Sequence, residues 1–98
     1  MRIENSAQAA DSQPMKILII EDDREAANYL SKAFAEAGHM IDLAADGDSG
    51  FSLADTGAYD VMVVDRMLPR RDGLSVISTL RAKGNKTPAL ILSALGQV

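Results

Sequence analysis

Residues 16–23 read Lys-Ile-Leu-Ile-Ile-Glu-Asp-Asp, so a short run of apolar, mostly β-branched residues is followed directly by acids. Two later stretches repeat this form: residues 61–65 read Val-Met-Val-Val-Asp, and residues 89–93 read Ala-Leu-Ile-Leu-Ser. Uncharged runs of this length are typical of strands that are buried on both faces of a sheet. Residues 39–44 place Ile41 and Leu43 on one face, which predicts one more strand, the second along the chain, nearer the sheet edge.

The segments between the predicted strands have the apolar spacing of helices. The first helix ends at Gly38, the second begins at the capping residue Asp46 and runs to about Thr56, and the third ends near Gly84. The apolar residues expected to face the sheet are Ala27, Leu30, Phe34 and Ala37, then Leu53 and Ala54, then Leu74, Ile77 and Leu80. Strands that alternate with helices predict a doubly wound α/β fold with a parallel sheet and helices on both faces.

Length and composition limit the class of protein. A chain of 98 residues allows one domain, and the Ser, Gln, Ala and Asn content of residues 1–14 predicts a disordered leader before it. No apolar run approaches the ~18 residues that a membrane helix needs. The absence of cysteine excludes disulfides and thiolate metal sites, and it favours a cytoplasmic location.

The charge balance argues against nucleic-acid binding by these residues. The net charge is -4, whereas affinity for a duplex depends on basic residues that neutralise phosphates. The nearest approach to a basic patch is Arg66, Arg70 and Arg71. Three arginines around one loop are interpreted as solvated surface or as a partner contact.

Acidic and hydroxyl side chains stand where the predicted strands end. Glu21 and Asp22 follow the first strand, Asp65 follows the third, and Ser93 follows the fourth. The carboxyl ends of parallel strands meet at one edge of a sheet, so we expect these side chains to converge. Capping of the first helix is the alternative explanation for the acids at 21–23.

Capping does not explain Asp65, because its carboxylate directly follows four apolar residues and lies close to other negative charge. A divalent cation resolves that conflict, and a few oxygen ligands suit Mg²⁺ better than Zn²⁺. Neither glycine-rich phosphate motif, G-x-x-x-x-G-K-[ST] or G-x-G-x-x-G, is present. A bound anion is therefore expected to be held by the metal, by backbone amides after Asp65 and by the Ser93 hydroxyl, with Asp65 as nucleophile.

Three motifs in order, K-I-L-I-I-E-D-D, V-M-V-V-D-R-M-L-P-R-R-D-G and T-P-A-L-I-L-S-A, resemble those of response-regulator receiver domains in two-component signalling. The resemblance spans residues 15–98 and is greatest to receivers of the OmpR/PhoB class of transcriptional regulators. It implies a flavodoxin-like (CheY-like) fold, a sensor histidine kinase as phosphodonor, and DNA contact only through an effector domain outside these residues. It also implies a phosphoacceptor and not a classical enzyme.

Transferred residue by residue, the resemblance implies Glu21 and Asp22 as the acidic pair and Asp65 as the phosphoacceptor. The backbone carbonyl of Met67 would complete the Mg²⁺ ligands from the protein. Ser93 matches the switch hydroxyl that carries the signal onward. Pro69 and Gly73 match the loop that shapes the site.

The sequence also departs from the family pattern. Receivers have a lysine followed by proline at the end of a fifth strand, then a fifth helix, and neither segment occurs before Val98. Lys86 lies at the start of the fourth strand, roughly 15 to 20 Å from the carboxyl ends, and cannot replace that lysine. These departures predict a fragment of a longer regulator, weak phosphorylation of this chain, and an open fourth strand that favours a homodimer.

Two other functions compete with this interpretation. A Mg²⁺-dependent phosphohydrolase of the haloacid dehalogenase type also uses a strand-end aspartate, but it needs a second aspartate where this chain has Met67. A receiver-like interaction module that works without phosphorylation stays open as the alternative. The single histidine, His39, has no partner at ligand spacing and receives no functional role.

Overall fold

The computed structural model describes residues 13–92, which form four strands and three helices. The order along the chain is β1 (Lys16–Ile20), α2 (Arg24–Glu36), β2 (Met40–Ala44), α3 (Gly47–Thr56), β3 (Val61–Asp65), α4 (Gly73–Ala82) and β4 (Ala89–Leu92). The predicted disordered leader and Ser93 lie largely or wholly outside the described residues. Within these residues, no helix has the length and apolar character needed to cross a membrane.

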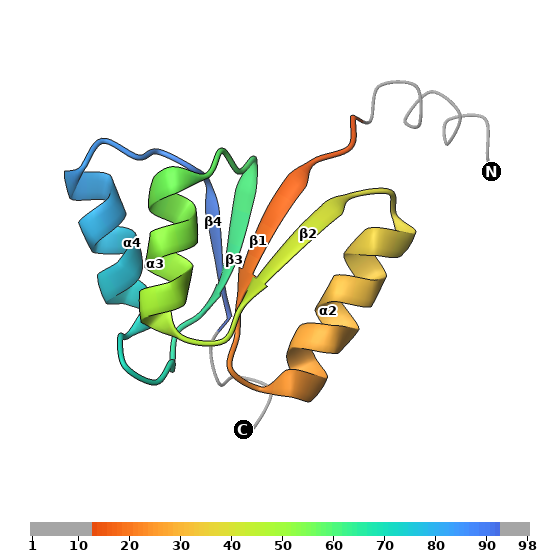
Figure 1. Cartoon of the computed structure of the whole chain (residues 1–98), viewed down its shortest axis with the longest axis horizontal. Helices are drawn as coiled ribbons and strands as arrows, with labels where there is room; N and C mark the ends of the chain where they lie inside the picture. The colour runs from red at the N-terminus through yellow and green to blue at the C-terminus, as the bar shows by residue number, and fades with distance from the viewer. Residues whose placement is uncertain (1–12, 93–98) are drawn as a thin grey trace.

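The four strands form one parallel sheet in the order β2-β1-β3-β4. Figure 1 shows α2 on one face of this sheet and both α3 and α4 on the other. The predicted doubly wound α/β architecture is therefore confirmed. The chain reverses its direction of travel across the sheet at β1, so the carboxyl ends of β1 and β3 lie at a switch in strand order.

Side chains alternate between two apolar clusters because successive residues of a strand point to opposite faces. The cluster under α3 and α4 contains Leu18, Ile20, Ala44, Ala54, Met62, Val64, Val76 and Leu80. The cluster under α2 contains Ile17, Ile19 and Val63, with Leu30 and Phe34 of α2 packed against it. The runs in β1 and β3 thus read as continuously apolar because both faces of these strands are covered.

The helix starts that the sequence predicts are built by capping side chains. The Asp23 carboxylate accepts a hydrogen bond from the Glu25 N–H at 3.0 Å and begins α2. The Asp46 carboxylate accepts one from the Ser49 N–H at 2.8 Å and begins α3. These bonds satisfy N–H groups that the first turn of a helix leaves without partners. Gly38 and Gly84 follow the ends of α2 and α4 with φ of 96° and 90°, a conformation that favours glycine.

The prediction that the fourth strand is buried on both faces is wrong for the described residues. Leu90 is 59% exposed and Ile91 is 46% exposed. The reason is position: β4 pairs with β3 on one side, and residues 13–92 place no strand on its other side. Strand β2, at the opposite edge, was correctly predicted to lie nearer an edge, and its Leu43 is 45% exposed.

His39 and Tyr59 have structural partners. The His39 Nδ1 accepts a hydrogen bond from the Met15 N–H at 3.0 Å, which agrees with the absence of a functional assignment. The Tyr59 hydroxyl donates to the Asp42 carboxylate at 2.6 Å and ties β2 to the segment before β3. Burial, together with the Asp42 carboxylate, raises the pKa of Tyr59 to about 12.

Candidate functional site

The register of the sheet brings the acids of two strands together. Ile20 of β1 pairs with Val64 of β3, so the next residues, Glu21 and Asp65, lie side by side at the carboxyl edge. Asp22 follows Glu21 where the chain turns toward α2. One carboxylate oxygen from each of these three residues lies within 4.8 Å of those of the other two. The structure thus brings together the three acids that the sequence singled out.

The three carboxylates differ in their surroundings. Glu21 is 7% exposed, and it is the buried charged residue among residues 13–92. Asp65 is half-buried and Asp22 is exposed. The sequence indicated an electrostatic conflict at the Asp65 carboxylate, but it did not indicate that Glu21 is the most buried of the three acids.

Burial raises the pKa of Glu21 to about 7. A hydrogen bond from the Asp23 N–H to Glu21 Oε2, at 2.9 Å, opposes this increase. The neighbouring carboxylates of Asp65 and Asp22 add to it, because a second negative charge disfavours ionisation. The cluster therefore holds more negative charge than the fold alone accommodates at neutral pH.

A divalent cation fits this donor set. Three convergent carboxylates offer hard oxygen ligands, and the Asp22 side chain is open to solvent, which leaves room for water on the ion. This group contains no histidine or cysteine, which are the ligands that Zn²⁺ and Cu sites favour. The predicted acidic metal site is therefore chemically consistent with Mg²⁺.

The loop at residues 66–72 places its backbone beside Asp65. The Met67 N–H donates a hydrogen bond to Asp65 Oδ1 at 3.0 Å. The Gly73 N–H bonds to the Arg66 carbonyl at 3.1 Å, and a Cβ at Gly73 would overlap the Asp65 carbonyl oxygen. The absence of a side chain at Gly73 thus allows α4 to begin directly against the end of β3. This contact is consistent with the expectation that Gly73 belongs to the loop that shapes the site.

A pocket of about 440 Å³ opens beside the acids, between α2 and the end of β2. Its lining includes Glu21 and Asp22 together with Arg24 and Asn28 of α2. Glu21 and Asp22 can therefore be reached from the solvent on this side. Lys86 precedes β4, at the opposite end of the sheet, as the sequence predicted.

The family model of the response regulator receiver domain matches residues 17–98. The chain belongs to this family. The transcriptional regulatory protein CusR of Escherichia coli K12 is 43% identical over 84 residues, which are 86% of this chain and 37% of CusR. This chain thus spans little more than a third of that relative, and the predicted resemblance to receivers of transcriptional regulators is confirmed.

Solved receivers share the fold. The receiver domain of the Francisella response regulator 1452 superposes with a TM-score of 0.80 at 40% identity, covering 83% of this chain and 67% of that chain. The response regulator TrrA of Thermotoga maritima, solved in complex with Mg²⁺-BeF, has a TM-score of 0.76 at 28% identity, covering 81% of this chain and 69% of TrrA. The predicted CheY-like receiver fold is confirmed.

Proposed function

We propose that this receiver accepts a phosphoryl group on Asp65 from a sensor histidine kinase, with Mg²⁺ bound by Glu21, Asp22, Asp65 and the Met67 carbonyl. The observation that carries the proposal is the convergence of three carboxylates from two adjacent strands within 4.8 Å, with Asp65 at the carboxyl end of β3. The relative TrrA, in complex with Mg²⁺-BeF, supports the choice of metal.

The transfer is a substitution at phosphorus. An Asp65 carboxylate oxygen forms the new O–P bond while the N–P bond of a phosphohistidine breaks and its electron pair returns to the imidazole ring. The Met67 N–H holds Oδ1 of Asp65 at 3.0 Å and so orients the carboxylate. A bound Mg²⁺ supplies positive charge to phosphoryl oxygens.

The output belongs to the same proposal. Ser93 is proposed as the switch hydroxyl, although it lies outside the described residues. The relative CusR is a transcriptional regulator, and this supports a transcriptional output through an effector domain in a cytoplasmic protein. DNA would be contacted by that effector and not by this acidic chain.

The proposal is tested with acetyl phosphate and intact-mass measurement. We expect slow modification of the chain that requires Mg²⁺ and stops when EDTA removes the metal. The comparison is one protein sample with and without the metal, so folding differences between variants do not enter. Equal modification in EDTA would refute a metal-dependent phosphoacceptor.

A second function, a phosphorylation-independent interaction module, is favoured by the exposed side chains of β4. Leu90 and Ile91 lie on a strand that pairs with β3 alone among residues 13–92, and uncharged edges of this kind tend to pair with another chain. We propose that the 98-residue chain forms a homodimer through this edge.

Size exclusion with light scattering tests the dimer. We expect a dimer at tens of micromolar protein, and Leu90→Lys should shift it to a monomer because a charged edge opposes strand pairing. The matched control is Met40→Lys, which places the same charge on β2 at the opposite edge, where Met40 is 63% exposed. A monodisperse monomer of the unmodified chain would contradict the proposal.

A further inference from the structure

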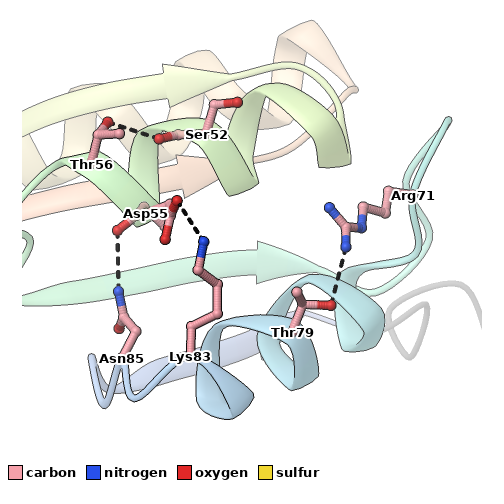
Figure 2. A network of polar contacts seen from close by, with 8 residues as sticks. Ser52, Asp55, Thr56, Arg71, Thr79, Lys83 and Asn85 are labelled. Carbon is pink, nitrogen blue, oxygen red and sulfur yellow. Dashed lines mark hydrogen bonds and ion pairs between the residues drawn. The ribbon is translucent and has the colours of Figure 1, made fainter.

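Arg71 lies near the end of the loop at residues 66–72, in the turn at residues 69–71 that is called the loop tip below, and it contacts both helices on its face of the sheet. Its guanidinium donates a hydrogen bond to the Thr79 hydroxyl of α4 at 3.1 Å, as Figure 2 shows. The same guanidinium lies 4.7 Å from the centre of the Phe51 ring of α3. One side chain therefore fixes the loop tip to α3 and to α4 at once.

The backbone at the loop tip packs equally closely against α3. A Cβ at Gly47, the first residue of α3, would overlap the Arg71 carbonyl and its Cβ. The Gly47 N–H approaches the Pro69 carbonyl at 3.4 Å, and the Arg71 N–H donates to that carbonyl at 2.7 Å. The backbone of the loop tip thus packs against the start of α3, and the contacts of the Arg71 side chain keep it in this position.

Arg70, the residue before Arg71, adopts an unfavourable backbone conformation, and its energetic cost must be offset by contacts elsewhere in the turn. Arg70 has φ of 71°, in the left-handed region that residues with a side chain disfavour. Its ion pair with Asp48, at 3.6 Å, is largely exposed and contributes little. The contacts of Arg71 are therefore the stronger restraint on this turn.

The loop that contains Arg71 also contains Met67, whose backbone lies beside Asp65. The Met67 N–H bonds to Asp65 Oδ1, and the Met67 side chain is 68% exposed, so its packing does not hold Met67 in place. The position of Met67 is therefore set by its neighbours in the loop: the Gly73 N–H holds the Arg66 carbonyl, Leu68 packs against the core, and the loop tip lies against the start of α3.

We propose that Arg71 is a positioning residue for the metal site, acting through the loop that presents the Met67 backbone to Asp65. The inference rests on the proposed function, because it assigns Arg71 to the same Mg²⁺ site. Arg71 touches neither the metal nor the phosphoryl group. It restricts the loop to the conformation in which the Met67 backbone stays beside Asp65.

The chain offers a matched control in Lys83, at the other end of the α3–α4 contact. Lys83 Nζ pairs with Asp55 at 3.0 Å and lies 5.4 Å from the same Phe51 ring, and Figure 2 shows this second tie away from the loop. Both residues join α3 to α4 through a cation and Phe51. Only Arg71 is part of the loop that follows Asp65.

The experiment measures Mg²⁺ affinity at pH 7.5 by following backbone amide signals, alongside urea denaturation of each variant. Arg71→Ala is expected to weaken Mg²⁺ binding about tenfold, as loss of a residue that supports a metal ligand does. It should also shift the Met67 amide signal in the metal-free chain. Lys83→Ala should change the affinity by less than about twofold even if it lowers stability equally. Arg71→Lys keeps a cation near Phe51 and should recover part of the affinity.

Thr79→Val keeps a folded comparison available if Arg71→Ala unfolds. It removes the hydroxyl that accepts the Arg71 hydrogen bond while conserving side-chain size, and it should weaken binding in the same direction. Unchanged affinity in Arg71→Ala, or equal losses in Arg71→Ala and Lys83→Ala, would overturn the positioning role while leaving the metal site intact. Failure of the unmodified chain to bind Mg²⁺ would instead overturn the proposed function itself.

Discussion

Asp65→Asn is expected to abolish Mg²⁺-dependent phosphorylation and to weaken Mg²⁺ binding by about 10- to 100-fold. The amide removes the carboxylate that is proposed as nucleophile, and with it one of the three carboxylates whose oxygens lie within 4.8 Å of one another. The fold should survive, because an amide oxygen can still accept the hydrogen bond from the Met67 N–H. Intact mass after acetyl phosphate treatment and a Mg²⁺ titration measure the two effects.

Asp23→Asn is the matched control for this substitution. Asp23 lies two residues from Glu21, but its carboxylate caps α2 by accepting the Glu25 N–H, and asparagine caps a helix equally well. Its Mg²⁺ affinity should stay within about threefold of the unmodified chain, because only a more distant charge is lost. Phosphorylation of Asp65→Asn at the unmodified rate would assign the phosphoryl group to another residue.

The second large effect concerns stability and pH. The pKa of Glu21 is about 7 in the fold against an ordinary value of 4.5. A group with a raised pKa in the folded state contributes stability that is fully present below pH 4.5 and is lost as the pH rises through about 7. The metal-free chain should therefore become less stable across this window, by about 3 kcal/mol, as Glu21 ionises beside Asp65 and Asp22.

Glu21→Gln should remove this loss, because glutamine keeps the acceptor for the Asp23 N–H without the charge. At pH 7.5 the metal-free variant is expected to be about 3 kcal/mol more stable than the unmodified chain, and the two should converge near pH 4.5. Urea denaturation followed by circular dichroism at several pH values measures the difference. Parallel pH profiles would contradict the assignment.

Mg²⁺ should reverse the effect in the unmodified chain and not in the variant. A cation that binds the folded chain and not the unfolded chain stabilises the fold by an amount that rises with the logarithm of the free cation concentration above Kd, and Mg²⁺ is expected to bind the ionised form of Glu21. The unmodified chain should therefore gain stability with added Mg²⁺ at pH 7.5, where the metal-free chain is weakest.

The sequence predicted the elements that depend on local pattern. The apolar runs in β1 and β3 are uncharged because both faces of these strands are covered. Asp23 and Asp46 mark the starts of α2 and α3 because their carboxylates cap these helices. The run at β4 looks the same as these two, yet Leu90 and Ile91 are exposed. An apolar run shows that a strand can be buried, whereas its actual exposure depends on which strands and helices lie next to it in the fold.

The predicted acids converge because strand register is a simple consequence of parallel pairing, which places Glu21 opposite Asp65. The sequence could not rank their burial, since the coverage of Glu21 depends on its bond to Asp23 and on neighbouring strands. The contacts of Arg71 were missed for a similar reason. An arginine beside other arginines resembles solvated surface, and only the folded chain places Phe51 and Thr79 next to its guanidinium.

Mg²⁺ is expected to bind at the edge formed by β1 and β3, through the carboxylates around Asp65. A titration of the uniformly labelled chain with Mg²⁺ at pH 7.5, followed by backbone amide signals, measures this binding. We expect saturable shifts concentrated at residues 21–23 and 65–68, with the ends of β2 and α4 far from the site unchanged. Shifts that do not saturate, or that spread evenly over acidic surface residues such as Asp48 and Asp55, would contradict Mg²⁺ binding at this edge.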